Sequence, residues 1–250
     1  MDNKRIYSTK AEKYARCRWD YAPAAIRAIF DLTGLPTDGV VADLGAGTGI
    51  LTRHFTGRAG KIYVVEPNDE MRREAEKALV GCDDCVLLDA PAEATGLPDG
   101  SVDLITVAQA IHWFEPQAAR NEFLRILKPG GWLVLIRNYG TDDEMGRALN
   151  AVCTPENGVD PHSVAPPPRN TPAEFYYGAG SCQKLTFPFE EQQDWEGFIG
   201  AMLSASYMPD EDHPAYAQFE AAVRQVFERF SQDGWRTLHG VTEMVIGQPV

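Results

Sequence analysis

The sequence predicts an α/β fold built on a doubly wound, mostly parallel sheet of seven strands. Short apolar runs of strand length alternate with segments of helical periodicity over the first 140 residues. The run 40–42 is followed by an acid and then by three glycines, as expected for a buried strand that turns tightly into a helix. Two further helical segments precede the last predicted strand, so we expect a C-terminal helical cap inserted there.

The predicted elements follow in chain order from these patterns. Residues 1–35 are helical and partly amphipathic, with an apolar stripe over 25–30. The predicted strands are 40–42, 61–67, 85–90, 102–108, 132–138, 183–189 and 242–247. The predicted helices after residue 35 are 50–55, 69–79, 116–127, 195–206 and 214–232.

Composition limits the classes of protein that fit this chain. With 250 residues and 44% hydrophobic content, it can bury one large core. The net charge of −13 argues against a nucleic-acid partner, because that affinity rests on Lys and Arg neutralising phosphates. No apolar run reaches the length of about 20 residues that spans a bilayer. The first eight residues lack the apolar core of a signal peptide, so we expect a cytoplasmic protein.

The five cysteines predict reduced thiols, because an odd number does not suit a disulfide framework. Cys82 and Cys85 form a single C-x-x-C, without a second pair or a nearby histidine. A structural zinc site needs four ligands. We therefore expect no bound metal.

The glycine-rich turn distinguishes between two nucleotide cofactors. A dinucleotide site reads G-x-G-x-x-G, whereas this turn reads G-x-G-x-G and has Ile50 at the place of the third glycine. Asp43 lies two residues before the first glycine, and a carboxylate there would repel a pyrophosphate but suit a cationic amine or sulfonium. These features favour S-adenosylmethionine over NAD.

The segment D-L-G-A-G-T-G over 43–49 resembles the first motif of class I S-adenosylmethionine-dependent methyltransferases. The block from Leu97 to Phe114, together with K-P-G-G at 128–131, resembles the small-molecule (type 11) branch, which includes trans-aconitate-like methyltransferases. The resemblance covers about residues 10–140. It implies a Rossmann-like methyltransferase core, S-adenosylmethionine as the cofactor and a small-molecule methyl acceptor.

Glu66 ends the second predicted strand, where an acid in nucleoside-binding sheets accepts the ribose hydroxyls; a helix-capping acid is the alternative. Met71 either covers the adenine or packs in the core. At the family's adenine corner, Ala92 and Glu93 match but Pro91 does not, which leaves the backbone or Asp89 to bind the base. The resemblance implies a cofactor site of Tyr14, Arg18, Asp43, Gly45, Ala46, Gly47, Thr48, Gly49, Glu66, Met71, Ala92, Glu93, Gln109 and Ala110.

Two residues are candidates for the catalytic step. The implied mechanism is an in-line displacement of the sulfonium methyl group, with catalysis by positioning and exclusion of water. His112 is the candidate base for an acceptor that must lose a proton, and a packed histidine is the alternative. Arg137 would orient a carboxylate acceptor, for which no base is needed, and a surface arginine is the alternative. Arg18 is either a partner of the cofactor carboxylate or a solvated helix residue.

We expect a single methyltransferase domain over 1–250. Its core is predicted over 36–140, with strands near 183–189 and 241–247, and its cap or lid over 141–181 and 193–233. The stretch 140–181 is turn-rich and contains three consecutive prolines at 166–168, which predicts an irregular cover over the acceptor pocket or a plain surface loop.

Two other function classes remain open on this sequence. One is a non-catalytic S-adenosylmethionine-binding protein that keeps the pocket but lacks an acceptor site. The other is a nicotinamide-dependent oxidoreductase, which the glycine spacing opposes.

Overall fold

The computed structural model describes residues 11–141, 143–160, 169–205 and 207–250. The chain divides into two compact units. The sheet unit consists of residues 20–138, 168–187 and 242–250, and the helical unit of residues 1–19, 139–167 and 188–241.

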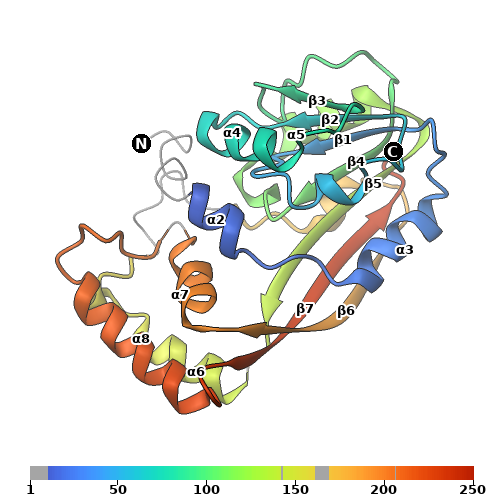
Figure 1. The fold of residues 1–250 in the computed structure, drawn as a ribbon. Coiled ribbons are helices and arrows are strands. Elements are labelled where there is room, and N and C mark those ends of the chain that lie inside the picture. Colours follow the sequence, from blue (N-terminus) through green and yellow to red (C-terminus); the bar gives the residue numbers. More distant parts are fainter. Residues whose placement is uncertain (1–10, 142, 161–168, 206) are drawn as a thin grey trace. The chain divides into compact units, whose positions relative to one another are not determined.

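Seven strands of the described residues form one sheet in the order β3-β2-β1-β4-β5-β7-β6 (Figure 1). Pairing is parallel from β3 through β2, β1 and β4 to β5, whereas β7 runs against β5. The strands are β1 Val40–Leu44, β2 Lys61–Val65, β3 Cys85–Leu88, β4 Val102–Ala108, β5 Leu127–Gly140, β6 Cys182–Gln193 and β7 Arg236–Gly247. The predicted mostly parallel, seven-stranded α/β sheet is confirmed.

The register of the sheet decides which residues meet at one edge. Asp43 on β1 lies beside Val64 on β2 and Thr106 on β4. The carboxyl ends of β1, β2 and β4 therefore lie next to one another, where ligands bind in open α/β sheets. The glycine turn, Glu66 and Gln109 all follow directly from these ends.

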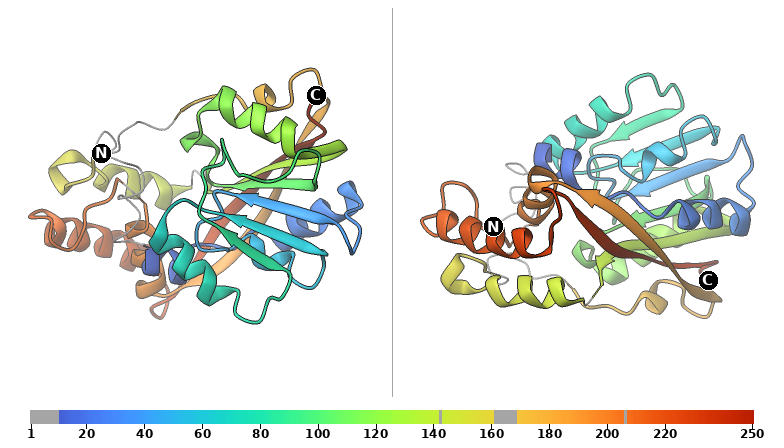
Figure 2. Two further views of the ribbon diagram at one scale, coloured as in Figure 1. Left: turned by 90° about the horizontal axis from the view of Figure 1, so that it is seen from above. Right: turned by 60° about the horizontal axis from the view of Figure 1, so that its bottom comes forward.

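Helices cover both faces of the sheet unit (Figure 2). The Asn68 side chain caps α4 by accepting the Met71 N–H, and Glu115 caps α5 by accepting the Ala118 N–H. Phe123 of α5 packs fully buried against the apolar strands, in the main core of this unit. The helices are α3 Pro23–Thr33, α4 Asp69–Ala78 and α5 Pro116–Ile126, with 3-10 turns η1 Thr52–His54, η2 Ile111–Trp113 and η4 Ala173–Tyr176.

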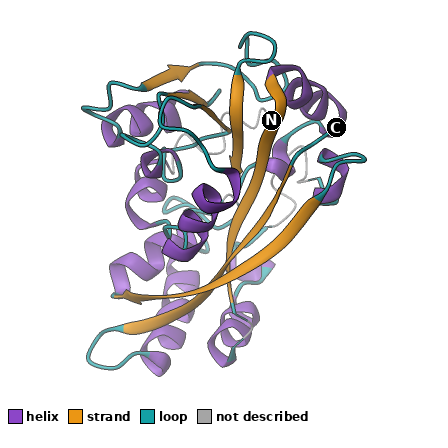
Figure 3. Ribbon diagram, turned by 90° about the vertical axis from the view of Figure 1, so that its right-hand side faces the viewer, coloured by secondary structure: helices purple, strands orange, loops and turns teal. Residues whose placement is uncertain are grey.

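The helical unit has its own apolar core. Phe198 and Phe227 stack with ring centroids 5.2 Å apart, and Phe219 and Val223 are fully buried beside them. Its helices are α2 Ala11–Cys17, α6 Glu144–Val152, α7 Trp195–Leu203 and α8 Tyr216–Phe230, with the 3-10 turn η3 Pro155–Asn157. Helices α7 and α8 fall between β6 and β7 in the chain, as predicted, and the two long strands are neighbours in the sheet (Figure 3).

Three predicted elements are wrong in detail. The predicted helix over 50–55 is the short 3-10 turn η1, whose bonds from His54 to Leu51 and from Phe55 to Thr52 span three residues. The stretch 140–181 is not wholly irregular, because α6 forms where Asp143 caps a segment of helical apolar spacing. The fifth strand begins at Leu127 and includes the K-P-G-G segment at 128–131, whereas the pattern predicts a strand only from residue 132.

The single-domain organisation and its cap over 141–181 and 193–233 stay predictions. The prolines at 166–168 and the first ten residues of the predicted N-terminal helical stretch lie outside the described residues. In the described part of the chain, every helix is too short or too polar to cross a bilayer.

Candidate active site

The turn after β1 requires glycine because its backbone has positive φ angles and because one of its positions has no room for a side chain. Gly45, Gly47 and Gly49 have φ angles of 67°, 59° and 80°, in the left-handed region that favours glycine. A Cβ at Gly45 would lie 2.7 Å from the Ala110 Cβ, so a side chain has no room there. A Cβ at Gly47 would meet no atom within 4 Å, so this part of the turn faces open space. The turn thus presents bare backbone at the edge where a ligand is expected.

Glu66 is oriented by the backbone of two neighbouring turns. Its Oε2 accepts a hydrogen bond from the Gly47 N–H at 2.9 Å, and its Oε1 accepts one from the Asn68 N–H at 2.8 Å. The side chain is only 7% exposed. Burial raises the pKa of Glu66, although these two bonds and the charge of Arg72 oppose the shift. Each carboxylate oxygen keeps a lone pair that can accept a ligand hydroxyl.

Asp43 is fully buried beneath the turn. Its Oδ2 accepts from the Thr52 hydroxyl at 2.6 Å, and its Oδ1 accepts from the Thr106 hydroxyl at 2.8 Å. Burial raises the pKa of Asp43 to about 6, despite the two threonine hydrogen bonds. The acid therefore links η1 to β4 and holds the turn in place.

The residue after β4 has an unusual backbone for its type. Gln109 has a φ of 57°, although it is not a glycine. Its N–H donates to the Ile136 carbonyl at 2.9 Å, and its side-chain Nε2 donates to the Asn138 carbonyl at 3.1 Å. Ala110 follows, 8% exposed, and packs against Gly45. These bonds hold the end of β4 against β5 at the sheet edge.

The remaining members of the turn are also held closely. The N–H of Ala46 donates to the Val65 carbonyl at 3.1 Å, which ties the turn to β2. The Thr48 hydroxyl is buried and has no hydrogen-bond partner among the described residues. A polar ligand can satisfy a buried hydroxyl that lacks a partner. The neighbouring backbone at Gly47 faces open space, so the turn fits a bound nucleoside.

The predicted adenine contacts lie partly in the protein interior. Met71 is 4% exposed in the first turn of α4. Ala92 is 3% exposed and belongs to the main core of the sheet unit. The Glu93 Oε1 accepts the Glu115 N–H at 2.7 Å. The side chains of Ala92 and Glu93 are therefore engaged with protein groups, and their backbone is what remains for a base.

His112 and Arg137 line one pocket of the sheet unit, which has a volume of about 290 Å³. The ring of His112 lies against Trp113, with centroids 4.8 Å apart. Arg137 is largely exposed, and its Nε and Nη2 contact the Glu243 Oε1 at 2.8 and 2.7 Å. The structure thus brings both predicted catalytic residues to one cavity, which Gln109 also lines.

Sequence reasoning missed four charged residues of this pocket, which are Arg169, Glu174, Lys184 and Glu243. The Arg169 N–H donates to the His112 carbonyl at 2.8 Å, and its Nη1 donates to the Phe114 carbonyl at 3.0 Å. Lys184 Nζ contacts the Glu243 Oε2 at 2.6 Å. Burial raises the pKa of Glu243, but the Lys184 hydrogen bond and the Arg137 charge bring it below its usual value. Glu243 is therefore an anion between two cations.

Tyr14 and Arg18 belong to the helical unit. The Arg18 guanidinium lies 5.2 Å from the Tyr14 ring centroid, and its Nη1 is 3.4 Å from the Ser204 Oγ. The contribution of Tyr14 and Arg18 to the cofactor site stays a prediction.

Comparison with known proteins identifies the family that this part of the chain matches. The model of the methyltransferase domain family (type 11) matches residues 42–135, which include the glycine turn, Glu66, Gln109 and His112. Residues 42–135 are a methyltransferase domain of the type 11 kind.

Relatives of this methyltransferase domain extend the comparison. The chain is 40% identical to an uncharacterised methyltransferase of Mycobacterium tuberculosis over 133 residues, 53% of this chain and 51% of that protein. It is 31% identical to the ubiquinone/menaquinone biosynthesis C-methyltransferase UbiE of Hydrogenovibrio crunogenus over 119 residues, 44% and 46% of the two chains. The chain thus spans about half the length of the curated relatives it matches.

A solved structure shares the fold over almost the whole chain. It comes from Anaeromyxobacter dehalogenans and is provisionally named a type II methyltransferase. It is 21% identical and has a TM-score of 0.64, covering 93% of this chain and 99% of its own.

The C-x-x-C pair lies at the start of β3, at the opposite end of the parallel strands from the glycine turn. Cys82 and Cys85 form a disulfide with an S–S distance of 2.14 Å, so the prediction of reduced thiols is wrong for this pair. Their Cα atoms are 5.6 Å apart, which suits a disulfide. Cys17, Cys153 and Cys182 are free.

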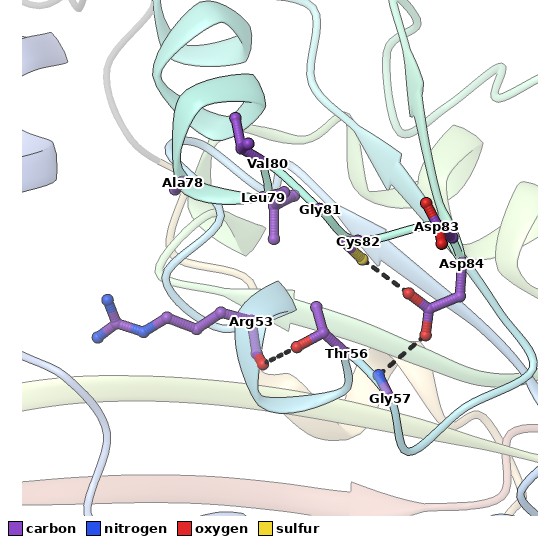
Figure 4. Close-up of a pocket in the computed structure, with 10 residues that line it drawn as sticks. All are labelled: Arg53, Thr56, Gly57, Ala78, Leu79, Val80, Gly81, Cys82, Asp83 and Asp84. Carbon is purple, nitrogen blue, oxygen red and sulfur yellow. Dashed lines mark hydrogen bonds between the residues drawn. The ribbon is translucent and has the colours of Figure 1, made fainter.

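A pocket of about 500 Å³ lies beside this disulfide (Figure 4). Cys82 Sγ is 2.7 Å from the Asp84 Oδ1, and the other Asp84 oxygen accepts the Gly57 N–H at 3.0 Å. The two sulfurs and the Asp84 carboxylate lie within 4.8 Å of one another. A disulfide supplies no thiolate, the form of cysteine that binds metals. The expected absence of a metal stays a prediction.

Proposed function

We propose that this chain is an enzyme that transfers the methyl group of S-adenosylmethionine to a small-molecule acceptor. One observation carries the proposal: the Glu66 carboxylate is joined to the Gly47 N–H, at the one glycine of the turn whose missing side chain leaves open space. A buried, oriented acid beside exposed backbone at the carboxyl ends of β1 and β2 is suited to a ribose.

The cofactor site that we propose contains the residues predicted from the sequence. Glu66 accepts the ribose hydroxyls, and the bare backbone of Gly45 to Gly49 allows close approach. Asp43 acts as a positioning residue, because both of its oxygens accept threonine hydroxyls. When bound, S-adenosylmethionine supplies an electrophilic methyl group on a sulfonium sulfur.

The acceptor site that we propose is the pocket lined by Gln109, His112 and Arg137. The acceptor is methylated in one in-line displacement without a covalent enzyme intermediate, so the protein contributes positioning and exclusion of water. A ring nitrogen of His112 takes the proton of an acceptor that must lose one. For a carboxylate acceptor no base is needed, and Arg137 with Lys184 supplies the positive charge, although Glu243 neutralises part of it.

Three further observations support a small-molecule acceptor. The volume of about 290 Å³ is near the lower end of the range of ligand pockets. The net charge of −13 opposes a nucleic-acid substrate. The name of the UbiE relative refers to the biosynthesis of quinones, which are small molecules.

Thermal unfolding with different ligands tests the cofactor. A ligand at 100 times its Kd adds about 2.7 kcal/mol to the free energy of unfolding. We expect S-adenosylmethionine and S-adenosylhomocysteine to raise the midpoint and NAD to leave it unchanged. A rise with NAD alone would indicate an oxidoreductase instead.

A screen of a metabolite pool for transfer of labelled methyl tests the activity. Labelled product from the intact chain, lost in Glu66→Ala, supports the enzyme. Tight S-adenosylmethionine binding without any labelled product would indicate a non-catalytic binding protein.

A further inference from the structure

A second pocket lies within the helical unit, and one cation is buried at its wall. Arg236, the first residue of β7, is only 7% exposed and lines this cavity of about 130 Å³. Most of the other lining side chains are apolar: Trp19, Met145, Leu149, Phe198, Met202 and Leu238.

The Arg236 guanidinium has five N–H donors but few acceptors. Its Nη1 is 2.8 Å from the Met145 Sδ, a weak acceptor, and its Cζ lies 5.0 Å from the Phe198 ring centroid. Its Nε is buried without a hydrogen-bond partner, and it forms no ion pair with any described residue. Burial lowers the pKa of Arg236, although the charges of Asp143 and Glu191 act against this at longer range. Arginine nevertheless stays charged in proteins.

Among the described residues that line this pocket, Asp143 is the one acid, and it is already engaged. Its Oδ1 accepts the Gly146 N–H at 2.7 Å, and its Oδ2 is 3.2 Å from the Thr141 hydroxyl. Asp143 thus serves as the cap of α6, and no described acid bonds the guanidinium directly.

A second buried polar side chain lies opposite Arg236. Two side-chain contacts indicate how β6 pairs with β7: Gln192 with Thr237 at 2.9 Å, and Glu190 with His239 at 3.2 Å. In this antiparallel pairing Gln193 faces Arg236 across the two strands, on the same side of the sheet. Gln193 is 3% exposed, and neither atom of its amide has a hydrogen-bond partner among the described residues.

We propose that this pocket binds a small organic acid, with the carboxylate held by Arg236 and the apolar body held by the surrounding side chains. The planar fork of arginine matches a carboxylate bidentately. The amide of Gln193, which is not itself a lining residue, is the buried polar group that faces Arg236 across the two strands. An apolar cavity of about 150 Å³ holds a benzene molecule, so the volume here suits a body of about six carbons. The proposal does not depend on methyl transfer.

The probes are benzoate and butyrate, with benzamide and butyramide as neutral controls of the same shape. Each is titrated into the full chain at constant ionic strength and followed by ligand-observed NMR and by the unfolding midpoint. We expect saturable binding of both carboxylates and at least tenfold weaker binding of both amides. Equal affinity for an acid and its amide, or no saturable binding of either acid, overturns the proposal.

Arg236→Met separates a ligand-binding role from a structural one. It keeps an unbranched side chain but removes the charge, so we expect at least tenfold weaker benzoate binding and an unfolding midpoint as high as that of the wild type or higher. Arg224→Met is the matched control, because Arg224 also lies over an aromatic ring, 4.0 Å from the Trp195 centroid, but is 45% exposed. Arg224→Met should bind benzoate like the wild type.

The stabilisation by S-adenosylmethionine is measured in every variant, so that failure of this site and failure of the cofactor site are told apart. Arg236→Lys keeps the charge without the fork and covers the case in which Arg236→Met does not fold. We expect it to weaken benzoate binding about tenfold. Unchanged benzoate affinity in a folded Arg236 variant overturns the proposal.

Discussion

Glu66 and Gly47 are joined by a hydrogen bond of 2.9 Å between the carboxylate of one and the backbone N–H of the other. The two residues follow neighbouring strands, so the bond ties together the turns after β1 and β2. The second Glu66 oxygen is held by the Asn68 N–H. The acid is thus oriented by the protein itself, which reduces the ordering that ligand binding would otherwise require.

Glu66→Ala should weaken S-adenosylmethionine binding by about 10- to 100-fold, because charge-assisted hydrogen bonds of about 1.5–3 kcal/mol are lost. Isothermal titration calorimetry measures this directly. Glu76→Ala, at an exposed acid on the adjacent helix α4, is the control and should bind normally. Unchanged affinity in Glu66→Ala would remove this residue from the site.

Gly47→Ala and Gly57→Ala form a matched pair. Both glycines have positive φ, 59° and 66°, and neither Cβ would meet an atom within 4 Å. Each variant should lose about 1 kcal/mol of stability from backbone strain. Only Gly47→Ala should also lose cofactor affinity, because its methyl group enters the space that we assign to the ligand. Equal affinity in the two variants would mean that the ligand lies elsewhere.

Asp43→Asn should change how stability depends on pH. The pKa of Asp43 is raised from its usual 3.8 to about 6, so the folded state holds this proton more tightly than the unfolded chain. As the pH rises from about 4 to about 6, the free energy of unfolding of the wild type therefore falls by about 3 kcal/mol in total. At higher pH it stays level. Below pH 4 the acid is protonated in both states and contributes no slope.

Urea unfolding at pH 4, 5, 6 and 7 measures this contribution. The stability of Asp43→Asn relative to the wild type should rise with pH up to about 6, because the amide carries no charge. The acid Asp103, which pairs with Lys128 at 2.7 Å and is partly exposed, gives the comparison variant Asp103→Asn. A stability difference between Asp43→Asn and the wild type that does not change with pH would contradict the raised pKa.

Arg169→Ala should lower kcat/KM about tenfold while leaving the Kd for S-adenosylmethionine within twofold. The Arg169 side chain donates to the carbonyls of Trp113 and Phe114 and so holds the wall of the pocket against His112. Arg120→Ala is the control, since Arg120 donates instead to the Val250 carbonyl. A loss of cofactor affinity equal to the loss of turnover would place Arg169 at the cofactor site instead.

The sequence predicts those parts of the site that depend on local pattern. Glycine spacing places the turn, and an acid after the second strand identifies Glu66, because both signals lie within one β-α-β unit. The pairing of Arg137 with Glu243 joins residues far apart in the chain and has no local signature. Arg169 is equally hidden, since it acts through carbonyl groups that any sequence possesses. The Cys82–Cys85 disulfide was missed because the number of cysteines says nothing about the distance between two of them.

At Gln109, a substitution that raises thermal stability is expected to lower turnover. A non-glycine residue in the left-handed region is strained by about 1–2 kcal/mol, so Gln109→Gly relieves that strain. The same substitution removes the bond from Nε2 to the Asn138 carbonyl and frees the backbone of the segment that leads to His112. Selection for heat resistance alone would therefore favour a glycine here, and selection for turnover would retain the glutamine.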